Sequence, residues 1–149
     1  PESSYSLAKL AGETLADQFT RRTGVPYVGL RISNIMEPED YQAFPSFWDD
    51  ATLRKWNLWG YVDARDVAAA CRRGLEASLT GHEIAIIAAA DTCMTRDSAD
   101  LMAEVYPQVR LTRALRGRET LLAIDHAREL LGYEPRHRWS DEVAGLTQD

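Results

Sequence analysis

Apolar side chains recur at three- and four-residue intervals near the start of the chain, which is the spacing of one face of an α-helix. The pattern predicts a helix over residues 4–22, with Ser3 or Ser4 capping its N-terminus and Gly24 ending it. The next apolar segment, residues 27–32, is short and continuous, as in a buried parallel strand. A helix, a glycine turn and a strand make half of a βαβ unit, so the pattern predicts an α/β protein.

Helix and strand patterns alternate along the rest of the chain. The isoleucine-rich residues 83–89 give the clearest strand pattern. The other predicted elements are a short helix over 46–55, strands at 58–62 and 109–113, a helix from a cap at Asp63 to about Ser78, a helix from a cap at Thr95 to Pro107, and a helix over 124–131. We therefore expect a partial, doubly wound (Rossmann-like) parallel sheet with a small C-terminal α/β region.

Composition narrows the class of protein. The 149 residues are 45% hydrophobic and 27% charged, which is typical of one globular domain. The longest apolar run, residues 84–90, is too short for a membrane span, and a net charge of −6 argues against a nucleic-acid-binding face. Two cysteines, Cys71 and Cys93, cannot form a disulfide framework, and the histidines have no acids at ligand spacing. We expect a cytoplasmic protein with a buried Cys71 and no metal site.

Tyr5 and Lys9 are the first candidates for chemistry. They are four residues apart on the first predicted helix, so their side chains leave the same face. A phenol ionises at about pH 10, so it needs a nearby positive charge to transfer a proton at neutral pH. A lysine one turn away supplies that charge, and the pair suits proton transfer with a substrate hydroxyl while hydride leaves the same carbon. The alternative is a solvated pair on the helix surface.

Several motifs occur in a family-specific order. They are PESSYSLAKLAGE at 1–13, LRISNIMEP at 30–38, YVDARDVAA at 61–69, the strand at 83–91, and LGYEP at 131–135 followed by Trp139. Together they resemble the C-terminal half of the extended short-chain dehydrogenase/reductase superfamily, the NAD-dependent epimerase/dehydratase family. The chain has no initiator Met and its first helix pattern begins at once, so we expect a piece of a longer protein.

The resemblance implies roles for particular residues. Tyr5 would be the general acid/base, and Lys9 would favour its phenolate and bind the nicotinamide ribose of NAD or NADP. Ile32 and Ile35 would form an apolar wall against the nicotinamide ring, so the cofactor-binding set is Tyr5, Lys9, Ile32 and Ile35. Asn34 would contact the substrate. The resemblance also implies a homodimer.

The same resemblance implies that the chain consists of two regions. Residues 1–35 would be the end of a dinucleotide-binding domain, and 36–149 mainly a substrate-binding region with a returning sheet strand near 83–89. The family's glycine-rich phosphate-binding turn, G-x-x-G-x-x-G, matches nothing in the chain. Since that turn brings backbone N–H groups to the pyrophosphate, we expect the chain alone to bind NAD poorly and to be inactive.

The substrate region departs from the nucleotide-sugar members. Trp59 stands where those members usually carry an arginine for the diphosphate. The departure favours a smaller sugar, a sugar acid or another polyol. Arg54 could bind the substrate in place of that arginine, or it could lie on a solvated helix face.

Two interpretations of the function stay open. The first is the C-terminal portion of an NAD(P)-dependent sugar or sugar-acid epimerase, dehydratase or dehydrogenase, with a small sugar-like substrate and neither a nucleic-acid nor a membrane partner. The second is a non-catalytic binding or structural module with the same fold. A cluster of aromatic residues could line a substrate pocket, but a small core or subunit contact is favoured; it comprises Phe44, Phe47, Trp48, Trp56, Trp59 and Tyr61.

Overall fold

The structure is a computed structural model that describes residues 2–143. Its elements, in chain order, are α1 (Ser4–Thr23), β1 (Tyr27–Ile32), β2 (Ile35–Met36), the 3₁₀ helices η1 (Pro38–Phe47) and η2 (Lys55–Asn57), β3 (Val62–Asp63), α2 (Ala64–Glu76), β4 (His82–Ile87), α3 (Ser98–Val105), α4 (Asp125–Leu131) and α5 (Trp139–Glu142). Pro1 and residues 144–149, at the ends of the two predicted domain ranges, lie outside the described residues.

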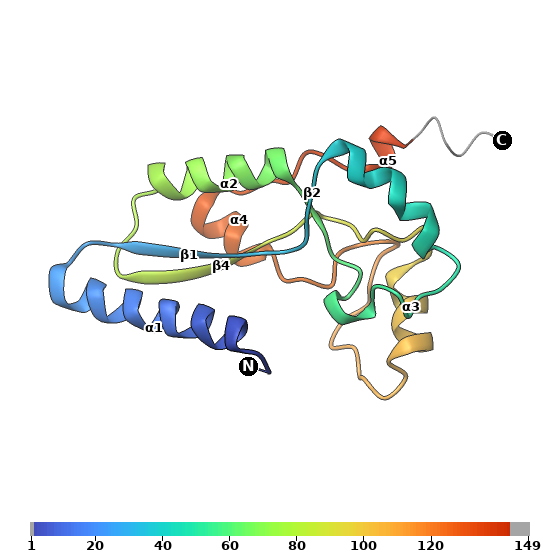
Figure 1. Ribbon diagram of the computed structural model, residues 1–149, viewed down its shortest axis with the longest axis horizontal. Helices are drawn as coiled ribbons and strands as arrows, with labels where there is room; N and C mark the ends of the chain where they lie inside the picture. Colours follow the sequence, from blue (N-terminus) through green and yellow to red (C-terminus); the bar gives the residue numbers. More distant parts are fainter. Residues whose placement is uncertain (1, 144–149) are drawn as a thin grey trace.

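Two parallel strands form the centre of the fold. β1 and β4 pair in parallel from Tyr27 opposite His82 to Ile32 opposite Ile87. Figure 1 shows α1 along one face of this pair and α2 and α4 on the other face. β2 and β3 form a second, very short parallel pair. The α/β class and the partial Rossmann-like sheet are therefore confirmed.

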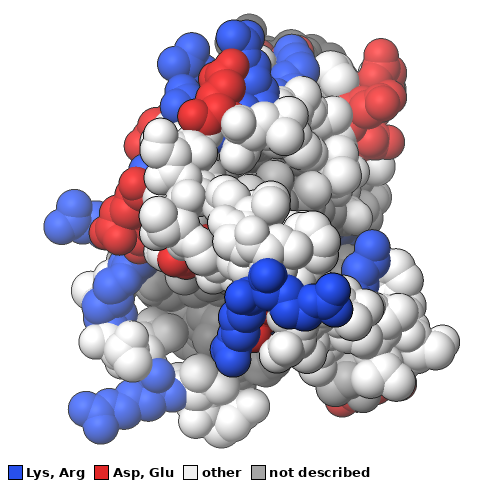
Figure 2. Space-filling view, turned by 90° about the vertical axis from the view of Figure 1, so that its left-hand side faces the viewer, with Lys and Arg blue, Asp and Glu red and all other residues white. Residues whose placement is uncertain are grey.

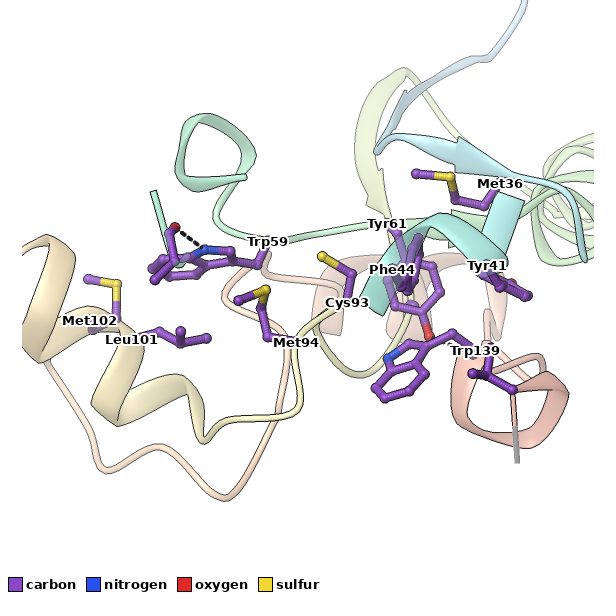
Figure 3. Close-up of a cluster of buried hydrophobic side chains, with 13 residues drawn as sticks. Met36, Tyr41, Phe44, Trp59, Tyr61, Cys93, Met94, Leu101, Met102 and Trp139 are labelled. Carbon is purple, nitrogen blue, oxygen red and sulfur yellow. Dashed lines mark hydrogen bonds between the residues drawn. The ribbon is translucent and has the colours of Figure 1, made fainter. Parts of the chain in front are cut away.

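A hydrophobic cluster, which we call the aromatic core, lies beyond the carboxyl ends of β1 and β4 (Figure 1). Figure 3 shows its side chains. Tyr41, Phe44 and Tyr61 are fully buried and meet edge to face, with ring centroids 5.3 to 5.9 Å apart. Trp59 and Trp139 are also buried in this cluster. Most of the aromatic run thus packs as a core, as the favoured interpretation predicts.

Two of the elements predicted for the segment between β1 and β4 are wrong. The helix predicted over 46–55 is replaced by η1, which begins earlier because Pro38 occupies its first turn and Asp40 accepts the N–H of Glu37 at 2.8 Å. The strand predicted over 58–62 is only Val62–Asp63, because Leu58 and Trp59 have φ values of 53° and 56° and turn the chain instead.

Three predictions elsewhere also need correction. The strand predicted at 109–113 does not form, and Val109 and Leu111 are exposed. The helix predicted to begin at Thr95 begins at Ser98 after Asp97. Cys71 is exposed rather than buried, because it follows Ala70 on α2 and the next position on a helix points away from the buried side.

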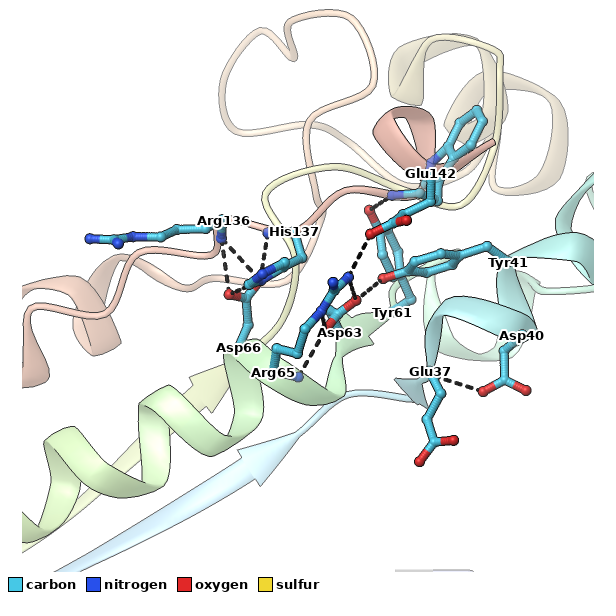
Figure 4. Close-up of polar contacts among 11 residues, drawn as sticks. Glu37, Asp40, Tyr41, Tyr61, Asp63, Arg65, Asp66, Arg136, His137 and Glu142 are labelled. Atoms are coloured by element: carbon cyan, nitrogen blue, oxygen red, sulfur yellow. Dashed lines mark hydrogen bonds and ion pairs between the residues drawn. The ribbon is translucent and has the colours of Figure 1, made fainter. Parts of the chain in front are cut away.

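Two buried carboxylates join α2 to distant parts of the chain (Figure 4). Asp63 caps α2 by accepting the Arg65 N–H at 2.8 Å, and it accepts the Tyr41 hydroxyl at 2.6 Å. Asp66 accepts backbone N–H groups of Arg136 and His137 and lies 2.9 Å from the His137 ring nitrogen. His137 therefore has an acidic partner that is distant in sequence, where only scattered histidines were expected.

The surface shows both signs of charge. On the face presented in Figure 2, Lys and Arg side chains stand beside Asp and Glu side chains around an uncharged centre. Within residues 2–143, no helix combines the length and apolar character that a membrane span requires.

Candidate active site

The first turn of α1 is fixed by a reciprocal cap. Ser6 donates its backbone N–H to the Ser3 hydroxyl at 3.1 Å, and Ser3 donates its own N–H to the Ser6 hydroxyl at 3.2 Å. Such a pair satisfies two donors that a helix N-terminus otherwise leaves free. The turn that carries Tyr5 is therefore ordered, and Ser3 rather than Ser4 is the cap.

Tyr5 and Lys9 lie together on this helix. The Lys9 ammonium is 5.2 Å from the centroid of the Tyr5 ring, within the range of a cation–π contact. Tyr5 is 71% exposed, so its phenol lies at the surface and not in packed hydrocarbon. The structure thus places a cation beside an accessible phenol, which the four-residue spacing predicts.

The end of β1 brings the other predicted residues to the same place. The Ser33 N–H donates to the Ile87 carbonyl, and the Val62 N–H donates to the Asn34 carbonyl, both at 2.9 Å. These bonds fix the chain where it leaves the sheet toward β2. A cavity of about 940 Å³ lies between α1 and the end of β1, and its walls include Tyr5, Lys9, Ile32, Asn34 and Ile35. Five of the six predicted site residues therefore line one cavity.

An ion pair that the sequence analysis missed also lines this cavity. Arg31 on β1 donates two hydrogen bonds to the Glu13 carboxylate on α1, at 2.8 and 2.7 Å. The hydrogen bond from Arg31 lowers the pKa of Glu13, against the opposing effect of partial burial. The pair ties the helix of Tyr5 to the strand of Ile32. No local pattern identifies it, because the two residues belong to different elements.

Arg54 is the predicted site residue that does not line this cavity. Its guanidinium lies 5.1 Å from the Phe47 ring centroid and 5.6 Å from that of Trp56. Its Nε and Nη2 atoms are buried, and neither has a hydrogen-bond partner within the described part of the chain. Arg54 is therefore neither an ordinary solvated residue nor a direct neighbour of Tyr5.

A second cavity, of about 560 Å³, adjoins the first. Tyr5, Ile32 and Asn34 border both cavities. The second cavity is also lined by Trp56 and Asn57, which do not line the first. Neither residue was singled out as a site residue from the sequence, although Trp56 belongs to the aromatic run.

The residues present fit one end of a dinucleotide. A cation and a phenol beside two partly exposed isoleucines, Ile32 and Ile35, offer both polar contacts and an apolar surface to a nicotinamide riboside. No group of three or more potential metal ligands occurs among residues 2–143.

Comparison with known proteins identifies the family. The model of the NAD dependent epimerase/dehydratase family matches residues 1–88, which is more than half of the chain. The chain belongs to this family. The matched residues include all of α1, β1 and β4. They therefore include every residue that lines the cavity of about 940 Å³. No curated protein matches the chain.

Solved structures show the same fold. RMD from Pseudomonas aeruginosa, complexed with NADPH, is 18% identical with a TM-score of 0.60, and the match covers 97% of this chain and 54% of that one. UDP-glucuronic acid 4-epimerase from Bacillus cereus, in complex with NAD, is 20% identical with a TM-score of 0.60, covering 96% and 49%. WbmF from Bordetella bronchiseptica, in complex with NAD+ and UDP, is 16% identical with a TM-score of 0.58, covering 98% and 55%. The chain spans about half the length of these structures.

Proposed function

We propose that this chain is the C-terminal portion of an NAD(P)-dependent sugar or sugar-acid epimerase, dehydratase or dehydrogenase. The observation that carries the proposal is the contact between the Lys9 ammonium and the exposed Tyr5 ring, at the mouth of a cavity lined by Ile32, Asn34 and Ile35. Family membership and the nicotinamide dinucleotides in the similar solved structures support the choice of cofactor.

In this proposal, residues of this chain transfer the proton to and from the substrate. The Tyr5 phenolate takes the proton of a substrate hydroxyl as the carbon that bears it is oxidised, and returns the proton when the carbonyl is reduced. Lys9 stabilises the phenolate through its positive charge and binds the ribose of the cofactor. Asn34 binds and orients the substrate. When bound, NAD(P) supplies the hydride acceptor.

The fixed position of Trp59 favours a substrate smaller than a nucleotide sugar. Trp59 is fully buried, and its indole N–H donates to the Ala51 carbonyl at 2.7 Å. A buried indole presents no charge to a diphosphate, which arginine binds with two parallel hydrogen bonds. We propose a free sugar or sugar acid as the substrate, and Arg54, whose Nε and Nη2 are buried without a partner among residues 2–143, as a residue of the substrate region.

The same proposal covers the wider organisation. Residues 1–35 would complete a dinucleotide-binding domain, and 36–149 would mainly bind the substrate. The exposed apolar residues of α1 favour a homodimer, as in the family the sequence resembles; they are Leu7, Leu10, Leu15 and Phe19. We also propose a cytoplasmic location for the protein.

The experiment is a pair of substitutions in the complete protein. Tyr5→Phe removes the phenolic oxygen and keeps the ring, so turnover of the sugar should fall by about 10² to 10⁴-fold. Net oxidation is followed at 340 nm, and epimerisation or dehydration by NMR of the sugar. Lys9→Met should lower the rate and weaken cofactor binding, because it removes the cation from the same turn. Tyr133→Phe is the matched control, since it removes a phenolic hydroxyl that lines neither cavity and that donates to the Ala88 carbonyl at 2.9 Å.

The outcome separates the two interpretations of the sequence. If Tyr5→Phe retains the rate of the unmodified protein, or if no sugar or sugar acid is oxidised, epimerised or dehydrated in the presence of either cofactor, the enzymatic proposal fails. Binding of a sugar without any turnover would favour the non-catalytic module.

A further inference from the structure

The aromatic residues between 44 and 61 divide into two groups. Phe44, Trp59 and Tyr61 are fully buried in the aromatic core. Trp56 is 70% exposed, and it borders the cavity of about 560 Å³ together with Tyr5. Burial in the core therefore explains most of the aromatic run, but it does not explain Trp56.

A strained and anchored turn holds Trp56 in this position. Leu58 and Trp59, two and three residues further on, have φ values of 53° and 56°, in the left-handed region that favours glycine. The turn is tied down on both sides, because Trp59 donates its indole N–H to Ala51 and Tyr106 donates its hydroxyl to the Lys55 carbonyl at 2.8 Å. Strain of this kind is retained where the surroundings enforce it, and it concentrates at ligand-binding sites.

Arg54 restrains the indole from another direction. Its guanidinium lies between the rings of Phe47 and Trp56, at 5.1 and 5.6 Å from their centroids. The planar cation is thus engaged by aromatic faces, while two of its nitrogens are buried without a partner among residues 2–143. Such stacking fixes the plane of an exposed indole.

The remaining walls of the cavity combine apolar and amide groups. Ile86 and Leu122 are apolar neighbours, and Asn34 and Asn57 are amides. The Asn57 amide nitrogen donates to the Gly60 carbonyl at 2.8 Å, whereas its Oδ1 is buried and has no donor within the described residues. A sugar ring has apolar C–H faces and a rim of hydroxyls, which match an indole face and amide groups respectively.

We propose that Trp56 is the stacking residue for a pyranose ring, opposite Tyr5, and that Arg54 is a positioning residue that acts through Trp56. This inference deepens the proposed function and rests on it for the identity of the cavity. Its consequence is specificity: the site selects cyclic sugars over open-chain polyols, because only a ring offers a flat apolar face to the indole.

Quenching of tryptophan fluorescence by acrylamide tests this binding directly. Three of this chain's four tryptophans are buried or partly buried, so the difference between the unmodified protein and Trp56→Phe isolates the accessible signal of Trp56. In the complete protein, saturating D-glucose, D-galactose, D-glucuronate or D-galacturonate should lower the quenching constant by about twofold, and D-sorbitol should not. Trp56→Phe should remove this effect of the pyranoses on quenching. If none of the four pyranoses protects Trp56, the inference is wrong.

Steady-state kinetics give a second test. Trp56→Ala should raise the KM for the best pyranose by about tenfold with little change in kcat, and Trp56→Phe should raise it less. Leu53→Ala, which removes another exposed apolar side chain from the same segment, is the matched control and should leave KM unchanged. Equal effects of Trp56→Ala and Leu53→Ala on KM would overturn the inference.

Arg54→Met should raise KM in the unmodified protein but have little further effect in the Trp56→Ala background, because it acts through the indole. Additive effects of the two changes would overturn the positioning role.

Tyr5→Phe separates the two proposals. It should abolish turnover of the sugar and leave the protection of Trp56 by pyranoses intact. Full activity of Tyr5→Phe would refute the proposed catalysis, and the quenching result would then decide the pyranose site independently.

Discussion

At the scale of single residues, two buried carboxyl groups respond to their surroundings in opposite ways. Burial acts to raise the pKa of Asp63, but hydrogen bonds from Arg65 and Tyr41 outweigh it and bring the pKa to about 2. Burial also acts on Asp91, and there it prevails, so the pKa is raised although the Tyr61 hydroxyl donates to the carboxyl at 2.7 Å. Arg65 makes the difference, because it forms an ion pair with Asp63 at 2.8 Å.

The low pKa of Asp63 predicts a loss of stability in acid. The folded state binds a proton at this carboxyl less readily than the unfolded state does, so its contribution is complete above about pH 4 and is lost as the pH falls toward 2. The free energy of unfolding, measured in urea, should fall by about 2 kcal/mol over this interval because of this group. Asp63→Asn should remove that part of the pH dependence; an unchanged profile would contradict the assignment.

Asp91 predicts the opposite dependence of stability on pH. Its raised pKa means that the folded state holds the proton more tightly than the unfolded state, so this stabilisation is present at low pH and is lost as the pH rises through the folded-state pKa. Asp91→Asn, which keeps an acceptor for the Tyr61 hydroxyl, should therefore be as stable as the unmodified chain or up to about 1 kcal/mol more stable at pH 7. Thermal unfolding at pH 7 checks this, and a clear drop in Tm would refute it.

At the scale of elements, the first helix depends on its cap. Ser3→Ala should lower the free energy of unfolding by about 1 kcal/mol, because it frees the Ser6 N–H that the Ser3 hydroxyl accepts. Hydrogen exchange should show faster exchange at Ser6. Ser4→Ala, one residue inside the helix, is the control and should have little effect. Equal effects at both positions would argue against the cap.

The elements also show what sequence patterns can and cannot predict. α1 and β1 agree with prediction within one residue, because helix periodicity and glycine or proline boundaries are local properties. The turn at Leu58 and Trp59 was missed, since a left-handed conformation at two such side chains is imposed by packing around Trp59 rather than by propensity. In the candidate site, the Tyr5–Lys9 contact was predictable from spacing, whereas Trp56 needed the tertiary fold to bring it to the same cavity as Tyr5.

At the scale of the whole molecule, the chain alone should bind NAD weakly. It contains residues suited to the nicotinamide end of the cofactor but no glycine-rich turn for the pyrophosphate. Isothermal titration of the 149-residue chain with NAD should give a Kd weaker than about 100 µM. Micromolar affinity would show that the chain holds the phosphates in another way.

The exposed face of α1 predicts association of the chain. Leu15 and Phe19 are 69% and 53% exposed, although large apolar side chains are usually covered. A double change to glutamate at these positions should shift the protein toward the monomer in light scattering, since it places charge on the contact face. Leu75→Glu, at a 90% exposed position on α2, is the control. A monomer at all concentrations before any substitution would refute the prediction.

The parallel pairing of β1 with β4 has a consequence for the order of folding. Tyr27 meets His82 across the sheet, so the first strand finds its neighbour only after the chain has passed through η1, η2, β3 and α2. Closing so large a loop costs entropy before any strand contact forms. Within residues 2–143, the amides of β1 that bond to β4 would therefore gain protection only after β4 has joined the sheet.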